Sequence, residues 1–318
     1  MKHKYIIFSN DYDYYRYMYS DVDTDICKVY YSLEDFINKK YKVLYKLANK
    51  NSIFKSRIII YLIKKSAQDL LSTTRNPIFF IWHKQYFVFL KKYLYEITRY
   101  LPNCKNIYYY TDIKDLADEK RLEFLKKNMD DIYIYDKQIA DKYHLQYWPE
   151  LYPKVNIIEN VVDIDLFFIG RAKGRINDLY RIAKLCENNE ITYKFILLDS
   201  NYDLNHISGI EYIHNELPYE KVLEYVKRSN CLLHLINKED VASLRVQEAV
   251  CFKKKLLTNN NVKASIPGAE SFIDIQYFNE NYDIDWKWVK SESQQTNLLD
   301  ENMFDSDKWF ENIEQKYY

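Results

Sequence analysis

Short apolar runs alternate with longer amphipathic segments along the first half of the chain. Runs of β-branched and aromatic residues predict strands at Tyr5–Ser9, Ile78–Trp82, Asn106–Tyr110 and Asp131–Tyr135. Apolar residues at helical spacing predict helices over Leu33–Leu47, Lys84–Tyr100 and Ile113–Lys127. Strands that alternate with helices are typical of a parallel sheet covered by helices on both faces.

A second series of the same kind begins near Asp163. It predicts strands at Asp165–Ile169, Lys194–Leu198, Ile210–Ile213, Cys231–Ile236 and Lys255–Thr258. It predicts helices at Arg175–Glu187, Tyr219–Arg228 and Ser243–Phe252, and a closing amphipathic helix in "FDSDKWFENIEQKYY". The proline-containing stretch "WPELYPKVNIIENV" separates the two series, so we expect an N-terminal domain over residues 1–150 and a C-terminal domain over 151–318. Both are expected to be Rossmann-like α/β domains with a ligand cleft between them.

The overall composition excludes several classes of protein. With 46 basic and 46 acidic side chains, the chain lacks the basic excess of a general nucleic-acid binder, and we expect no nucleic-acid partner. The five cysteines are widely spaced and form no C-x-x-C pair, which argues against a zinc site or a disulfide framework. The apolar run near the N-terminus is too short for a signal peptide, and none approaches the ~18 residues of a membrane span. We therefore expect a cytoplasmic protein.

Two of the four glycines lie in one short stretch, "DLFFIGRAKGRIN", residues 165–177. Gly170 follows an apolar strand, where it permits a close backbone approach, and Gly174 opens the next helix. The free N–H groups at a helix N-terminus suit an anion, and Arg171, Lys173 and Arg175 add positive charge there. A pyrophosphate held against this backbone would explain the glycines. A plain strand–turn–helix with solvated basic residues is the other interpretation, since the G-x-x-x-G spacing is not the dinucleotide fingerprint.

A second stretch, "INKEDVASLRVQEAVCFKKKLLTNN", also combines a strand end with a helix start. Arg245 and Glu248 are three residues apart and share one face of that helix near its N-terminus. A carboxylate there can accept hydrogen bonds from the two hydroxyls of a ribose. A surface ion pair is the simpler alternative.

Three stretches, "DLFFIGRAKGR", "LPYEKVLEYVKRSNCLLHLI" and "LRVQEAVCFKKKLLTNN", resemble the donor-binding half of bacterial GT-B glycosyltransferases. The resemblance is to the group that acts in lipopolysaccharide, capsule and exopolysaccharide assembly. The stretches "YYYTDI" and "IYIYDKQIADKYHLQYWPELYP" resemble the end of that group's first domain. The similarity covers roughly residues 78–260.

The resemblance implies a GT-B fold, in which two Rossmann-like domains with parallel sheets face a central cleft. The C-terminal domain would bind a nucleotide-diphosphate sugar, and the N-terminal domain a glycan or lipid-linked glycan acceptor. The protein would be a metal-independent hexosyltransferase of class EC 2.4 without a cofactor. The resemblance assigns the donor-binding residues Gly170, Arg171, Lys173, Gly174, Arg175, Arg245 and Glu248.

One departure from the family pattern supports a rival function, and a second rival stays open independently of it. The family usually has a glycine in the loop before "LR", where this chain reads "KEDVAS", and Glu239 and Asp240 place negative charge near the expected phosphates. The first rival is therefore a non-catalytic nucleotide- or glycan-binding partner in a polysaccharide assembly complex. The second is a nucleotide-sugar isomerase of the same general fold. The sequence also leaves open whether the chain forms a homo-oligomer.

The candidates on the acceptor side follow strands of the first half. His83 comes after "PIFFIW" and is a candidate general base, because histidine titrates near neutral pH; a structural histidine is the alternative. Asp112 follows another strand end and is the second catalytic candidate. The basic, apolar run Ser52–Gln68 either contacts the inner face of the membrane peripherally or packs as an ordinary helix. Several D-x-D triplets occur in this aspartate-rich chain, and we expect no metal site from them.

Overall fold

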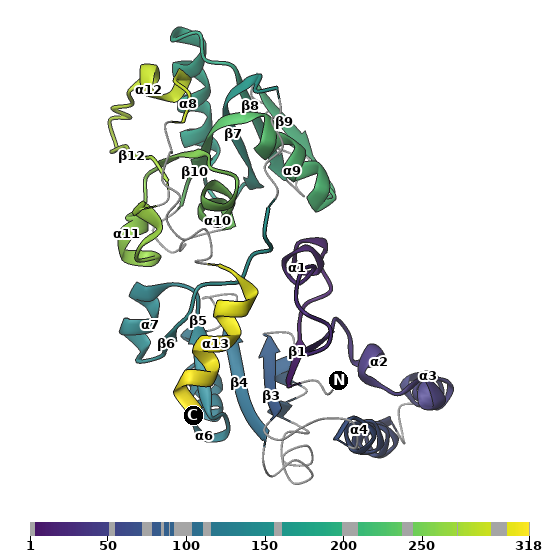
Figure 1. Cartoon of the computed structure of the whole chain (residues 1–318). Coiled ribbons are helices and arrows are strands. Elements are labelled where there is room, and N and C mark those ends of the chain that lie inside the picture. The colour runs from purple at the N-terminus through teal and green to yellow at the C-terminus, as the bar shows by residue number, and fades with distance from the viewer. Residues whose placement is uncertain are drawn as a thin grey trace. The chain divides into compact units, whose positions relative to one another are not determined.

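The computed structural model describes residues 4–50, 55–71, 78–83, 86–88, 90–91, 104–110, 116–155, 161–198, 209–236, 244–271, 273–293 and 304–317. The chain divides into two compact units (Figure 1). Unit 1 comprises residues 1–135 and 139–148, and unit 2 comprises residues 136–138 and 149–318.

Unit 1 is built on a six-stranded parallel sheet. Its strands are β1 (Tyr5–Phe8), β2 (Cys27–Tyr30), β3 (Ile78–His83), β4 (Cys104–Tyr110), β5 (Asp131–Ile134) and β6 (Gln146–Tyr147). The strand order is β2-β1-β3-β4-β5-β6, with Phe8 opposite both Tyr30 and Trp82. The helical elements among the described residues are α1 (Asp13–Met18), α2 (Leu33–Phe36), the 3₁₀ turn η1 (Lys39–Tyr41), α3 (Lys42–Lys50), α4 (Lys55–Leu71), α6 (Glu119–Asn128) and α7 (Lys137–Tyr143).

The predicted helix over Leu33–Leu47 is wrong, because the chain breaks into α2, η1 and α3. Ile37 is extended, with φ −66° and ψ 122°. The Asn38 side chain then accepts a hydrogen bond from the Lys40 N–H and starts a new turn. Asparagine competes with helical backbone hydrogen bonds in this way, so apolar spacing alone overestimated the helix.

The helix predicted over Ile113–Lys127 is observed from Glu119 to Asn128. Asp118 caps its start, since the Asp118 side chain accepts a hydrogen bond from the Arg121 N–H at 3.1 Å. The aspartate cap sets the first residue of the helix, whereas apolar periodicity alone predicted a start several residues earlier. Most of the helix predicted over Lys84–Tyr100 lies outside the described residues.

Unit 2 contains a second six-stranded parallel sheet. Its strands are β7 (Ile164–Arg171), β8 (Tyr193–Leu198), β9 (Ile210–Ile213), β10 (Ser229–His234), β11 (Lys255–Thr258) and β12 (Ile275–Tyr277). The order is β12-β11-β10-β7-β8-β9. Its helical elements are α8 (Ile176–Asn188), α9 (Tyr219–Arg228), α10 (Leu244–Cys251), α11 (Val262–Ser265), the 3₁₀ turn η4 (Ala269–Ser271), α12 (Trp286–Lys290) and α13 (Ser306–Tyr317).

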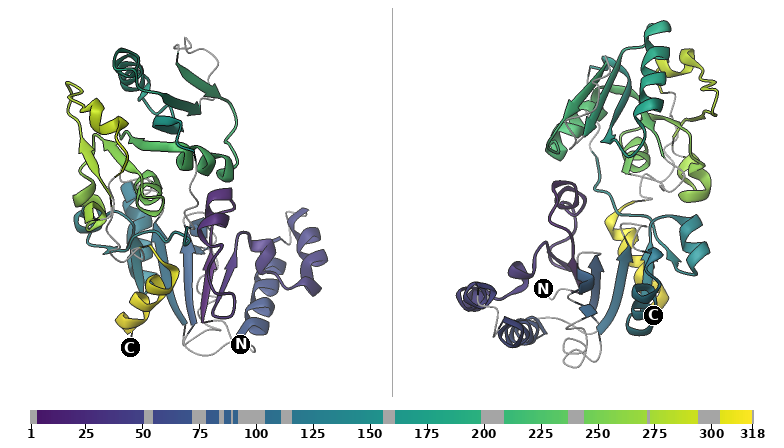
Figure 2. Two further views of the ribbon diagram at one scale, coloured as in Figure 1. Left: turned by 45° about the horizontal axis from the view of Figure 1, so that its top comes forward. Right: turned by 180° about the vertical axis from the view of Figure 1, so that it is seen from behind.

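Neighbouring residues of β7 face opposite sides of the sheet, and both sides carry helices. Phe168 packs in an apolar core with Leu179 of α8. On the other side the Phe167 ring stacks on Tyr225 of α9, with ring centroids 5.5 Å apart. The two parallel sheets with their surrounding helices, drawn as arrows and coiled ribbons in Figure 2, confirm the predicted α/β class with two Rossmann-like domains.

Each sheet has a point at which the direction of strand addition reverses. In unit 2 this switch point lies between β7 and β10, which pair directly, with Leu166 opposite Cys231. In unit 1 it lies between β1 and β3, which also pair directly. Ligands of open α/β sheets bind outside the carboxyl ends of the strands at such a point, because the connections there leave toward opposite faces.

Candidate functional site

The glycine-containing stretch lies at the switch point of unit 2. Gly170 is near the carboxyl end of β7, which ends at Arg171. A Cβ atom at Gly170 would lie 3.2 Å from Phe168 Cζ and 3.4 Å from the Arg175 guanidinium. Gly170 therefore gives the Arg175 side chain room to lie across the end of the strand.

The backbone turns sharply between β7 and α8. Lys173 has φ 38° and Gly174 has φ 77°, and both values lie in the left-handed region that favours glycine. Arg175 is the N-cap of α8 and closes the turn by donating its N–H to the Ala172 carbonyl at 2.7 Å. The Arg175 side chain makes no capping hydrogen bond to the start of this 13-residue helix. The helix N-terminus thus directs backbone N–H groups and partial positive charge toward the switch point.

The basic residues of this turn have different surroundings. The Arg171 guanidinium forms an exposed ion pair with Glu216, at 2.5 Å from Arg171 Nη2 to Glu216 Oε1. Arg175 is half-buried and contacts Gly170, and Lys173 is exposed. Arg175 is therefore the basic side chain of the turn that lies beside Gly170 and is partly shielded from solvent.

The second stretch follows β10, the neighbour of β7, and leads into α10. Glu248 lies on α10 and is fully buried. Its Oε1 accepts a hydrogen bond from the Tyr219 hydroxyl at 2.8 Å, and its Oε2 forms an ion pair with Arg245. The Tyr219 hydroxyl in turn shares a 2.8 Å hydrogen bond with Tyr152. Arg245 also lies over the Phe167 ring of β7, at 5.9 Å from the centroid.

This network is a buried charge pair with hydrogen-bond support. Burial raises the pKa of Glu248, whereas Arg245 and the Tyr219 hydroxyl oppose that shift by favouring the carboxylate. Burial also raises the pKa of Tyr219 well above its usual value, and the Glu248 carboxylate adds to this rise. Removing Arg245 would take the opposite charge away from the buried Glu248 carboxylate, and breaking a buried ion pair typically costs about 3–5 kcal/mol. The prediction of a surface ion pair is wrong, because Glu248 has no exposed surface.

For Glu248 to hold a ribose, its carboxylate would have to become accessible. Both of its oxygens already contact Tyr219 or Arg245. The Arg245 side chain is 11% exposed, whereas Glu248 has no exposed surface. The assignment of Glu248 to ribose remains a prediction.

The β10–α10 loop and one catalytic candidate lie outside the described residues. Residues 237–243 include Glu239 and Asp240, and residues 111–115 include Asp112. The predictions made for these residues therefore stand as predictions.

His83 is the last residue of β3 and lies at the switch point of unit 1. It is 1% exposed, and its Nε2 shares a 2.8 Å hydrogen bond with the Tyr19 hydroxyl. The rings of Tyr15, Tyr19 and Tyr109 lie within 6.0 Å of the imidazole, measured between ring centroids. Burial lowers the pKa of His83 to about 3, so the ring is neutral at physiological pH.

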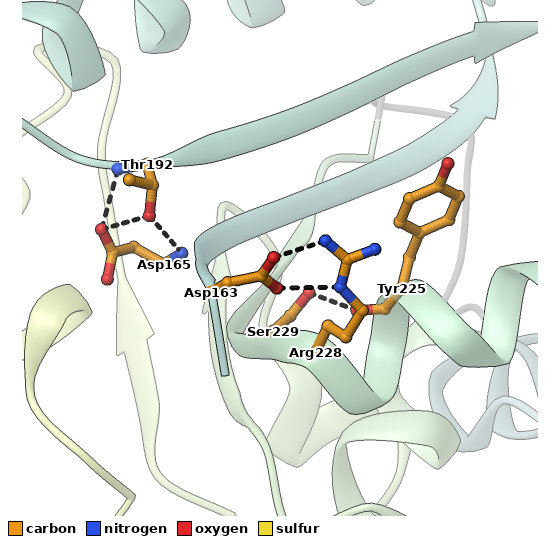
Figure 3. A network of polar contacts seen from close by, with 6 residues as sticks. All are labelled: Asp163, Asp165, Thr192, Tyr225, Arg228 and Ser229. Atoms are coloured by element: carbon orange, nitrogen blue, oxygen red, sulfur yellow. Dashed lines mark hydrogen bonds and ion pairs between the residues drawn. The ribbon is translucent and has the colours of Figure 1, made fainter. Parts of the chain in front are cut away.

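The D-x-D pair of Asp163 and Asp165 lies at the opposite end of β7 from the switch point (Figure 3). Asp163 pairs with Arg228, whose Nε donates to Oδ1 at 2.8 Å. Asp165 Oδ2 accepts hydrogen bonds from the Thr192 N–H at 2.8 Å and the Thr192 hydroxyl at 2.7 Å. The two carboxylates bind different partners, and both sets of contacts stabilise the start of β7. Across the described ranges, no group of three Asp, Glu, His or Cys side chains is placed to bind a metal ion.

Sequence reasoning missed the tyrosines that contact the predicted site residues. Tyr219 and Tyr152 adjoin Glu248, and Tyr19 adjoins His83. With 33 tyrosines in the chain, no local signal distinguishes Tyr19 or Tyr152. Tyr219 alone had a marker, because it follows Pro218 at the first position of a predicted helix.

Comparison with known proteins gives distant structural similarities. No protein-family model matches the chain. No curated protein matches it either. An α-glucosyltransferase solved with UDP and a mismatched 13-mer DNA is 11% identical, with a TM-score of 0.39, over 98% of this chain and 89% of the other. The glycotransferase of kitacinnamycin is 9% identical, with a TM-score of 0.39, over 87% of each chain. The glycosyltransferase SnogD from Streptomyces nogalater is 8% identical, with a TM-score of 0.37, over 99% of this chain and 95% of the other.

Proposed function

We propose that this protein is a glycosyltransferase of the GT-B type that binds a nucleotide-diphosphate sugar at the switch point of unit 2. It would transfer the sugar to a hydroxyl of a bacterial surface-glycan acceptor, free or lipid-linked. One observation carries the proposal. The two stretches assigned to the donor, about seventy residues apart, follow the adjacent parallel strands β7 and β10 on either side of the switch point.

The proposed reaction needs stabilisation of a departing anion. The bond between the sugar's anomeric carbon and the diphosphate oxygen breaks, the acceptor oxygen bonds to that carbon, and the acceptor hydroxyl gives its proton to a general base. Arg175 and the backbone N–H groups at the start of α8 would stabilise the charge on the nucleoside diphosphate as it leaves. We propose that this step uses no metal and no separate cofactor. His83 and Asp112 are the proposed acceptor-side groups, and the proposed location is the cytoplasm, at the inner face of the membrane.

A thermal-shift panel with UDP, GDP, CMP and dTDP, with and without magnesium, tests the donor site first. Ligands that bind only the folded state raise its melting temperature, by about 5 °C when the ligand is far above its dissociation constant. We expect one nucleotide to give such a shift, and Arg175→Ala to weaken its affinity on the order of ten-fold, because a guanidinium–phosphate contact is lost.

Arg228→Ala is the matched control, because it removes a guanidinium at the opposite end of β7 and should leave the nucleotide shift unchanged. Glu248→Ala is a poor first variant, since it removes the buried carboxylate that pairs with Arg245. A folded protein that shows no shift with any of the four nucleotides would contradict the donor site.

The non-catalytic alternative has an observation in its favour. Arg171 and Glu248, two of the assigned donor residues, already have partners within unit 2. Such a protein would bind a nucleotide or glycan without turnover. Release of nucleoside diphosphate from a nucleotide sugar, dependent on an acceptor, separates the two functions. Turnover of the donor without an acceptor and without that release would instead identify an isomerase.

A further inference from the structure

We propose that α3 of unit 1 is a docking surface for an anionic lipid bilayer. The exposed face of α3 carries three large apolar side chains: Val43 is 74%, Leu44 42% and Leu47 60% exposed. Val43 and Leu47 are one helical turn apart, so they lie on the same side of the helix. The inference rests on unit 1 alone and does not depend on the donor site.

The stretch of sequence that contains this face is strongly basic. Residues 39–68 contain nine lysines and arginines and no aspartate or glutamate, in a chain whose formal net charge is zero. The remaining residues therefore carry 46 − 9 = 37 basic and 46 acidic side chains. Among the described side chains of the segment, Lys46 pairs with Glu34 and Lys40 with Asp69, both from outside it.

The two helices of this segment have different roles. The predicted membrane-contacting run, Ser52–Gln68, falls largely on α4. In α4, Ile59, Leu62 and Ile63 are buried in the core of unit 1. These side chains of α4 therefore stabilise the fold, whereas α3 exposes aliphatic side chains and α4 exposes Tyr61 at 51%.

Neighbouring elements hold α3 with its apolar face outward. Tyr45, on the opposite side of α3, is buried in the same core as Ile59. Asn38, just before η1, donates its backbone N–H to Ser66 Oγ at 3.0 Å and its side-chain amide to Asp69 Oδ2 at 2.8 Å. Figure 1 shows α3 beside α4, beyond β1 on the side away from β4, and the view from behind in Figure 2 agrees.

An anionic bilayer fits this combination better than a nucleic acid. Amphipathic helices with lysines beside an apolar face lie in the membrane interface, where apolar side chains enter the acyl boundary and lysines attract anionic headgroups. A nucleic-acid backbone would satisfy the lysines but would leave Val43 and Leu47 in contact with a highly charged surface.

Vesicle flotation of the full chain tests the proposal. We expect binding to vesicles of phosphatidylglycerol and phosphatidylcholine, weaker binding as salt rises, and little binding to phosphatidylcholine alone. Val43→Glu and Leu47→Glu should each reduce partitioning about ten-fold or more, because burial of an apolar side chain is lost. The control is Val161→Glu, at an 83% exposed valine of unit 2, and it should partition like the unaltered protein.

Circular dichroism of every variant shows whether it is folded. Three results would overturn the proposal: no binding of the folded protein to anionic vesicles, equal loss in the Val161→Glu control, or binding unaffected by Val43→Glu and Leu47→Glu. A further overturning result is tight binding of single-stranded RNA that depends on Lys42 and Lys46 but not on Val43. Failure here leaves the nucleotide shifts of unit 2 unaffected, so the two proposals can fail separately.

Discussion

His83 lies at the switch point of unit 1, and its surroundings disfavour the protonated, positively charged imidazole. Its ring is buried, hydrogen-bonded to Tyr19 through Nε2 and surrounded by tyrosine rings. Efficient general bases have a pKa near the working pH, whereas burial lowers the pKa of His83 to about 3. A catalytic role for His83 therefore requires the bound acceptor to change this environment.

The same lowered pKa predicts a pH dependence of stability. The folded-state pKa lies below the ~6.5 of an unfolded histidine, so the unfolded chain binds the proton first as the pH falls. The contribution of His83 is fully present above about pH 6.5 and is lost progressively toward pH 3, at up to about 1.4 kcal/mol per pH unit. Urea unfolding at several pH values should show a shallower acid slope for His83→Gln than for the unaltered protein.

His144→Gln is a suitable control for that measurement, since His144 is exposed. Its acid slope should match that of the unaltered protein. Equal slopes for all three proteins would show that His83 gains its proton as easily in the folded state as in the unfolded chain.

At the scale of elements, Asn38 separates α2 from η1 and α3 within the segment that was predicted as one helix. It starts η1 with its side-chain oxygen, and its backbone N–H and side-chain amide bond to Ser66 and Asp69 of α4. Asn38→Ala removes the cap and the amide bond, and we expect a loss of about 1–2 kcal/mol in the free energy of unfolding.

Asn128→Ala is the matched control at the end of α6, where the side chain makes an exposed hydrogen bond to the Phe124 carbonyl at 2.7 Å. It should cost less than Asn38→Ala, because water can replace an exposed bond. Chemical denaturation measures both variants. If Asn38→Ala were as stable as the control, the break between α2 and α3 would have to come from packing rather than from this cap.

At the scale of the whole molecule, each unit has its own sheet and its own apolar core. We therefore expect calorimetry to show two unfolding transitions rather than one two-state transition. Phe80→Ala should lower only the transition of unit 1, and Leu233→Ala only that of unit 2, since each side chain is at most 1% exposed in its own core. A nucleotide that binds unit 2 should raise only the second transition.

A single transition lowered equally by Phe80→Ala and Leu233→Ala would contradict this independence. It would show that the two cores unfold cooperatively. No helix in the described parts of the chain is long and apolar enough to cross a membrane.

The sequence by itself determined the elements whose signals are local. Buried parallel strands are continuous apolar runs, so β1, β9 and β11 were predicted to within a residue of their bounds. The helix from Tyr219 to Arg228 was predicted with its bounds, because Pro218 marks its start. The strand–helix alternation gave the α/β class for the same reason, since periodicity and turn residues act over a few positions.

Only the tertiary structure decided which distant residues meet. Parallel pairing of β7 with β10 brings the stretch from Gly170 to Arg175 and the start of α10 to one edge of a sheet. Burial decided that Glu248 contacts Tyr219 and Arg245, and that His83 contacts Tyr19. Strand order and side-chain burial depend on contacts between residues far apart in the chain, and no short sequence pattern encodes these.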